Sequence, residues 1–149
     1  MPMKSITPAA RGLGIDIRVY EVRSKVELEP ALAAAVRDGV HALYVSEAPH
    51  LLVLRAEIAA QVASVRLPAM YSFREYVQSG GLMSYGSDLP DLYRRAAAYV
   101  DKILKGNNPG ELPLQSAEKF ELVVNLKAAK QTGVTIPPKG LMWADRVIE

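Results

Sequence analysis

The chain has 149 residues, of which 50% are hydrophobic and 23% charged, and its mean hydropathy is +0.05. This composition is typical of one globular domain and too apolar for a disordered chain. Lys and Arg exceed Asp and Glu by only two, and both signs are spread along the chain, so no basic stripe indicates nucleic-acid binding. The absence of cysteine excludes disulfides, thiolate metal sites and thiol catalysis. We expect no metal and no cofactor.

No apolar run approaches the length of about 18 residues that a membrane-spanning helix needs. Residues 1–13 contain Lys4, Arg11 and small side chains but no apolar core of a leader. As written, the chain is therefore expected to carry no signal peptide.

Apolar runs rich in β-branched residues alternate with helical patterns along the chain. The predicted strands cover residues 15–22, 41–45, 67–71, 82–86 and 120–124. The first predicted helix begins at or after Ser24, and two more cover residues 51–65 and 72–78. Asp88 caps a helix that runs to Lys105, and Asn125 caps one that runs through Gln131. A last helical turn or two extends through Val147. Strands that alternate with helices favour an α/β fold, here a three-layer sandwich around a parallel sheet.

In such sheets ligands bind beyond the carboxyl ends of the strands. The loops expected there are 21–24, 46–50, 71–74 and 85–88, which carry hydroxyls, carboxylates, aromatic rings and one arginine. This set can bond and stack on a small polar solute. The same residue types also cap helices, which is the expected role of Ser24 and an open alternative for Ser46 and Ser72.

Enzyme signatures are absent from the sequence. Gly12 and Gly14 precede a predicted strand instead of following one, and no nucleophile elbow or phosphate-binding lysine loop occurs. Glu47 and His50 share one loop and are the only catalytic pair to consider, although a surface histidine beside a carboxylate is more often structural. Trp143 is expected to be a packing residue, and we expect no catalytic residue.

Residues 67–86 read LPAMYSFREYVQSGGLMSYG. This segment resembles a largely uncharacterised family of ABC-transporter substrate-binding proteins, whose members carry a related P-A-I-Y…L-x-S-Y-G pattern. The similarity continues through DLYRRA at 91–96, YVDKILKG at 99–106, KFELVVNLK at 119–127 and GVTIP at 133–137. It spans essentially the whole chain.

The resemblance implies a type I periplasmic-binding fold, in which two α/β lobes close on a solute by a hinge motion. Family members are usually about twice as long, so residues 1–149 are expected to form one lobe, the C-terminal half. By the same analogy, segment 87–112 crosses to the other lobe or to a partner chain. The implied setting is the periplasm, and the implied partners are the membrane subunits of an ABC importer.

The resulting hypothesis is a non-catalytic binding component for a small polar solute such as an amino acid. The residues expected to bind the solute are Ser46, Glu47, Tyr71, Ser72, Phe73 and Tyr85. Arg74 could meet a carboxylate, although solvent is its simpler environment.

The alternative is an orphan lobe that only self-associates. An apolar stripe along the helix predicted over 89–105 supports association: Leu92, Ala96, Val100, Ile103 and Leu104. Without a partner lobe this stripe must fold back or pair with another chain, which predicts a homodimer or larger assembly.

Overall fold

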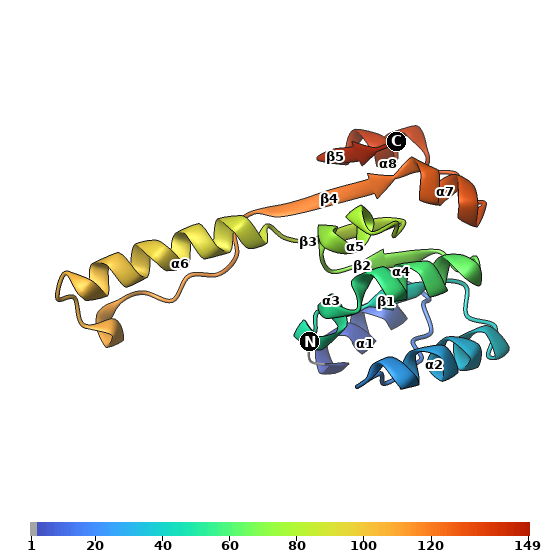
Figure 1. The fold of residues 1–149 in the computed structure, drawn as a ribbon, viewed down its shortest axis with the longest axis horizontal. Coiled ribbons are helices and arrows are strands. Elements are labelled where there is room, and N and C mark those ends of the chain that lie inside the picture. The colour runs from blue at the N-terminus through green and yellow to red at the C-terminus, as the bar shows by residue number, and fades with distance from the viewer. Residues whose placement is uncertain (1–2) are drawn as a thin grey trace.

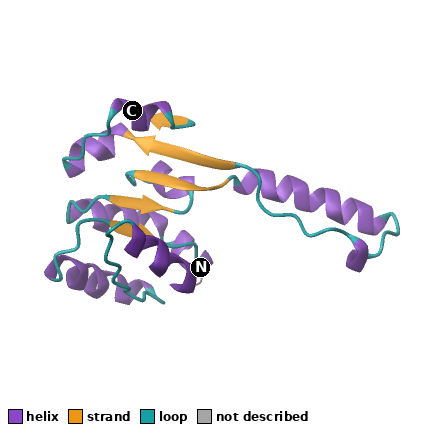
Figure 2. Ribbon diagram, turned by 180° about the vertical axis from the view of Figure 1, so that it is seen from behind, coloured by secondary structure: helices purple, strands orange, loops and turns teal. Residues whose placement is uncertain are grey.

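Five strands form one sheet in a computed structural model that describes residues 3–149, with side chains from Ile6 onward (Figure 1). Their spatial order equals their chain order: β1 (Leu43–Val45), β2 (Ala69–Tyr71), β3 (Met83–Ser87), β4 (Phe120–Asn125) and β5 (Arg146–Ile148). Helices cover both faces (Figure 2). The expected α/β class is confirmed.

One strand pair departs from the expected parallel sheet. β1, β2 and β3 are parallel, as are β4 and β5, but β3 and β4 are antiparallel. The reason lies in the connection: the chain leaves β3 along an extended arm and returns along the same arm, so it re-enters the sheet in the opposite direction.

The helices are α1 (Met3–Gly12), α2 (Lys25–Arg37), α3 (Pro49–Val53), α4 (Arg55–Ser64), α5 (Arg74–Gln78), α6 (Leu89–Leu104), the 3₁₀ turn η1 (Pro109–Glu111), α7 (Leu126–Thr132) and α8 (Pro138–Met142). From α2 onward the helices lie close to the predicted ranges, but helix α1 was not predicted from the sequence. Two predicted caps form, because Asp88 accepts a hydrogen bond from the Asp91 amide and Asn125 accepts one from the Ala128 amide. Ser24 stands at the N-cap of α2 without a side-chain cap bond.

Three predicted elements differ in the structure. Residues 15–22 form no helix or strand and pair with no strand in the described chain. The helix predicted over 51–65 is two helices, α3 and α4, which meet at Leu54. The last predicted helical turns end with α8 at Met142. Residues Arg146–Ile148 form strand β5 instead, because they pair with β4, which lies far away in the sequence.

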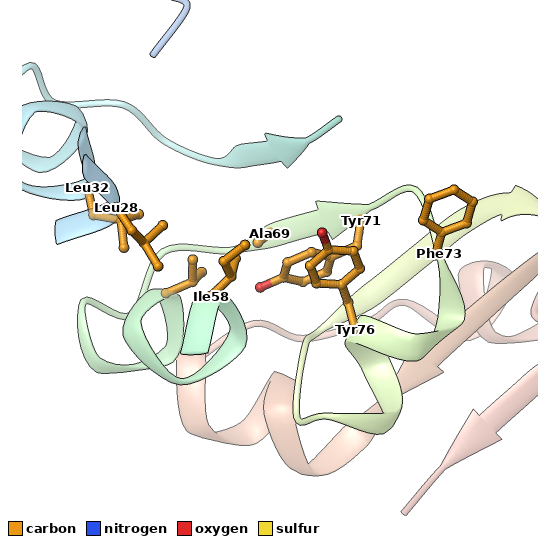
Figure 3. Close-up of a cluster of buried hydrophobic side chains, with 8 residues drawn as sticks. Leu28, Leu32, Ile58, Ala69, Tyr71, Phe73 and Tyr76 are labelled. Carbon is orange, nitrogen blue, oxygen red and sulfur yellow. The ribbon is translucent and has the colours of Figure 1, made fainter. Parts of the chain in front are cut away.

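The main core lies between the sheet and helices α2, α4 and α5 (Figure 3). It joins two leucines of α2 to α4, β2 and the β2–α5 turn; its buried residues are Leu28, Leu32, Ile58, Val62, Ala69, Tyr71, Phe73 and Tyr76. A smaller cluster, of Leu82, Ala128 and Ala129, packs α7 on the sheet. The smaller cluster lies at the start of β3, whereas the main core extends to Tyr71 and Phe73 at the end of β2.

Helix α6 projects away from the lobe as an arm, and the returning coil runs beside it (Figure 1). Arg95 binds Gln115 at 2.9 Å and Glu118 at 2.8 Å, and the Tyr99 hydroxyl donates to the Pro113 carbonyl. Asp91 is the only buried residue of the helix. The sheet therefore covers none of the apolar stripe along the outer turns of α6.

Candidate ligand-binding site

The carboxyl ends of β1 and β2 lie beside the middle of β3, which continues to Ser87. Val45 pairs with Tyr71 and Tyr71 pairs with Ser84. The next residues along the three strands are Ser46, Ser72 and Tyr85, so these three predicted site residues lie side by side where β1 and β2 end. Polar residues that end neighbouring parallel strands are the usual way in which an open α/β sheet builds a binding site.

Tyr71 and Phe73 do not face that edge. Tyr71 is 1% exposed, and its ring stacks on the Tyr76 ring with centroids 4.8 Å apart. The Tyr71 side chain points toward α5, which carries Tyr76, and the next side chain, Ser72, points to the opposite side of the sheet because side chains alternate along a strand. Figure 3 shows Phe73 beyond the end of β2, apart from the tyrosine pair, and it too is buried in the main core. In this structure both aromatic residues are packing residues.

Ser72 is the polar residue at this edge with an unmet bonding need. It is 5% exposed, and its Oγ has no hydrogen-bond partner among the described residues. A buried hydroxyl without a partner costs about 1–3 kcal/mol. Its carbonyl oxygen lies against Gly86, where an added Cβ would come within 1.8 Å of it. Glycine is therefore required at position 86 for the turn after β2 to approach β3.

Arg74 is paired, contrary to the expectation that it faces solvent. Its Nη1 donates to Glu121 Oε1 at 3.0 Å, and its Nε lies 3.8 Å from Glu75. Glu121 pairs with Gly86 in the β3–β4 ladder, so this ion pair lies next to the Ser72–Gly86 contact. Sequence reasoning missed Glu121 because 47 positions separate it from Arg74, and only the antiparallel return of β4 brings the two together.

Tyr85 is the exposed aromatic residue of the site, with 54% of its surface accessible. Its ring stacks on Phe120 with centroids 5.9 Å apart. Tyr85 and Gly86 alternate along β3, so the Tyr85–Phe120 pair and the Arg74–Glu121 pair occupy opposite faces of the sheet. The two pairs border the place where the chain leaves the lobe for α6.

Ser46 and Glu47 are exposed, as a solute contact would require. His50, the possible catalytic partner of Glu47, places its Nε2 3.0 Å from the Val22 carbonyl. A carbonyl can only accept, so Nε2 carries the proton there. This bond ties α3 to segment 15–22 and gives His50 a structural role.

Other site chemistries find no support in the part of the chain that the structure describes. Residues 3–149 contain no group of three or more acidic or histidine side chains placed to hold a metal ion. Within the same residues, no helix combines the length and apolar character needed to cross a membrane. The groups present at the candidate site are the hydroxyls of two serines, the Glu47 carboxylate, the exposed Tyr85 ring and an arginine that is paired with Glu121.

Comparison with known proteins shows which family the chain belongs to. The model of the ABC transporter substrate binding protein family matches residues 2–148. The chain belongs to this family. The resemblance stated from residues 67–137 is thereby confirmed, and the binding-protein fold with it.

Three relatives show the same relation. A tyrosine-binding protein of Clostridioides difficile is 23% identical over 148 residues, a match that covers 83% of this chain and 43% of that protein. The crystal structure of a conserved domain protein from Vibrio cholerae superposes with a TM-score of 0.89 at 26% identity and covers 97% of this chain and 49% of that one. The structure of an ABC domain from Streptococcus pneumoniae in complex with L-Trp superposes with a TM-score of 0.87 at 25% identity. That match covers 97% of this chain and 50% of the other.

The chain thus spans about half the length of the relatives that it matches. What the whole relatives bind is a property of those proteins.

Proposed function

We propose that this chain is a non-catalytic, solute-binding lobe of an ABC importer and that its solute is an amino acid. One observation carries the proposal: a buried Ser72 Oγ, without a partner among the described residues, lies where β1 and β2 end beside β3. An amino-acid ammonium or carboxylate group could satisfy that hydroxyl, and the exposed Tyr85 ring could cover an apolar side chain. Relatives described as binding tyrosine and L-Trp support an aromatic amino acid.

Each site residue has one role in this proposal. Ser46 and Ser72 bond polar atoms of the solute, Glu47 attracts its ammonium group, and Tyr85 stacks on its side chain. Arg74, already bound to Glu121, positions the β2–α5 turn and does not bind the solute itself. The protein acts in the periplasm and delivers the solute to the membrane subunits, as the family resemblance implies.

The arm supports a further part of the proposal, which is self-association. Val100 and Leu104 of α6 are exposed, and Leu104 reaches 82%. Burying one such side chain is worth about 1.5–3 kcal/mol, so an uncovered stripe favours a homodimer in which two arms pack together or exchange. The same observation supports the alternative, an orphan lobe that associates without binding a solute.

The chain contains a matched control for the binding site. Ser72 and Ser84 are both buried serines whose Oγ atoms have no partner among the described residues. Ser84 lies within β3 and pairs with Val123 of β4, whereas Ser72 follows the last residue of β2. We expect Ser72→Ala to weaken binding of L-tyrosine or L-tryptophan about tenfold, the value of one hydrogen bond to a charged group. Ser84→Ala should leave the affinity unchanged.

Isothermal titration of both variants and the parent chain measures this difference. Equal affinities for parent and Ser72→Ala would remove Ser72 from the site. If the parent protein binds neither amino acid while it forms a stable dimer, the orphan-lobe alternative is favoured.

A further inference from the structure

Phe120 forms a stacked pair with Tyr85, although only Tyr85 is among the predicted binding residues. Phe120 is the first residue of β4 and is 50% exposed. The planes of the two rings lie 22° apart, so the rings are nearly parallel. Water is a poor surrounding for aromatic rings, and a stacked pair that stays half exposed therefore offers apolar surface for a further contact.

The backbone at Phe120 is fixed on both sides of β4. Five residue pairs set the register of β3 and β4, and Phe120 lies opposite Ser87 in it. Figure 1 shows the two strands side by side where they lead to the arm. The next residue, Glu121, accepts a hydrogen bond from Arg74 at 3.0 Å on the other face of the sheet. The Phe120 ring thus stands on a firmly held strand.

The Tyr85 ring, in contrast, depends on Phe120 for its position. Met83, two residues earlier in β3, packs against the cluster around α7, whereas Tyr85 lies beyond that cluster and is half exposed. No hydrogen bond holds the Tyr85 hydroxyl among the described residues, and among them Phe120 is the one aromatic ring that stacks on it. Without the Phe120 ring, the Tyr85 side chain would exchange more freely between its rotamers.

Phe120 covers one face of the Tyr85 ring and leaves the other face free. Strand β3 lies between β2 and β4, so the free face is turned toward β2. Ser72 follows the last residue of β2 and lies on the same side of the sheet as Tyr85, because Tyr71 pairs with Ser84 and side chains alternate. The free face of the ring therefore points to the side on which the proposed solute site places its hydroxyls.

We propose that Phe120 is a positioning residue of this site and that it selects for solutes with an aromatic side chain. Phe120 holds the Tyr85 ring so that its free face is a flat apolar surface, and the solute ring stacks there as the third ring of a row. A planar ring gains from such stacking beyond the burial of its area, whereas a branched aliphatic side chain gains from burial alone. The inference rests on the proposed function and adds to it a residue and a preference for L-tryptophan over L-leucine.

Isothermal titration of Phe120 variants with L-tryptophan and L-leucine tests the selection. Phe120→Leu keeps an apolar side chain but removes the ring. It should weaken binding of L-tryptophan about three- to tenfold and change the affinity for L-leucine less than about twofold. Phe120→Tyr keeps the ring and should retain the preference of the parent chain.

Tyr93→Leu is the control, because Tyr93 is 74% exposed on α6 and stacks on no ring among the described residues. It should show the same ratio of affinities as the parent chain. In Phe120→Leu, an equal loss for both amino acids, or no loss for either, would overturn the inference.

Indole separates this inference from the proposed function, because indole carries an aromatic ring without the ammonium and carboxylate groups. The NMR signals of the Tyr85 ring are followed while indole is added to the parent chain and to Phe120→Leu. We expect these signals to shift in the parent chain and to shift at least about threefold less in the variant.

If the parent chain binds neither amino acid but shows this difference with indole, the proposed function fails while Phe120 keeps its positioning role. Tyr85 signals that respond neither to indole nor to L-tryptophan would overturn the inference. Tyr85 signals that change only on dilution of the protein would also overturn it, because a second copy would then cover the ring.

Discussion

Tyr76 combines a fully buried ring with an unsatisfied hydroxyl. Its side chain is 0% exposed, its ring stacks on Tyr71, and its Oη has no partner among the described residues. The ring contributes packing, whereas the oxygen contributes only the cost of losing its water. The two effects can be separated by substitution.

Tyr76→Phe keeps the ring and removes the oxygen. We expect the free energy of unfolding, measured by urea denaturation, to stay equal or to rise by about 1 kcal/mol. Tyr76→Ala, which also removes the ring, should lower it by about 3 kcal/mol. A loss of more than about 1 kcal/mol in Tyr76→Phe would show that the hydroxyl has a bonding partner in solution.

The same tyrosines predict how stability depends on pH. Burial raises the pKa of Tyr76 from 10.0 to about 12 and also raises the pKa of Tyr71. In the unfolded chain these hydroxyls lose their protons near the ordinary tyrosine pKa of 10.0, whereas in the folded chain they still hold them at that pH. The contribution of these two tyrosines to stability should therefore be constant below pH 10 and fall as the pH rises from 10 toward 12. Denaturation midpoints measured across this window should fall less steeply in Tyr76→Phe; identical slopes would contradict the assigned cause.

Side-chain direction limits what sequence could predict of the site. The carboxyl-end loops were predictable, because strand–helix alternation is visible in the sequence, and the structure does bring Ser46, Ser72 and Tyr85 side by side where β1 and β2 end. The sequence could not predict whether the Tyr71 side chain points into the core or toward the site, since a shift of one residue in register reverses the direction of every side chain in a short strand. The Arg74–Glu121 pair depends on a strand order that no local pattern encodes.

At the scale of elements, local signals predicted helices better than strands. Asp88 and Asn125 cap their helices because a short polar side chain before an amphipathic stretch is a local cause. Segment 15–22 has the pattern of a strand but lacks a neighbour to pair with, and Arg146–Ile148 has little pattern but gains β4 as a partner. A strand needs a second strand, so its existence is decided by tertiary structure.

The arm supplies a prediction at this scale. Val100 and Leu104 share one exposed face of α6, and burying them would drive association. The double substitution Val100→Lys and Leu104→Lys should weaken self-association at least about tenfold without loss of helix, since each aliphatic side chain contributes more than 1 kcal/mol when buried. Sedimentation velocity gives the mass, and circular dichroism gives the helix content.

Ala98→Lys is the control, because Ala98 lies on the polar side of the helix with Arg94 and Lys102. It should associate like the parent chain. A double variant that associates as strongly as the parent would show that the arm is not the interface.

At the scale of the whole molecule, the chain has the fold of its binding-protein relatives and spans about half of their length. Two features carry the proposed function: the carboxyl ends of β1 and β2, with Ser46 and Ser72, and the exposed arm of α6. We propose that a solute binds at the first and that a second copy of the chain covers the other. Neither feature calls for catalytic chemistry.

Native mass spectrometry of gently purified protein, with L-tyrosine or L-tryptophan added, tests the central claim most directly. It reports the assembly state and any bound small molecule in one spectrum. The account predicts a dimer that carries the added mass of the amino acid, and it predicts that Ser72→Ala loses this mass while Ser84→Ala retains it. A bare chain at millimolar amino acid, with the fold intact, would contradict the claim that this lobe binds such a solute.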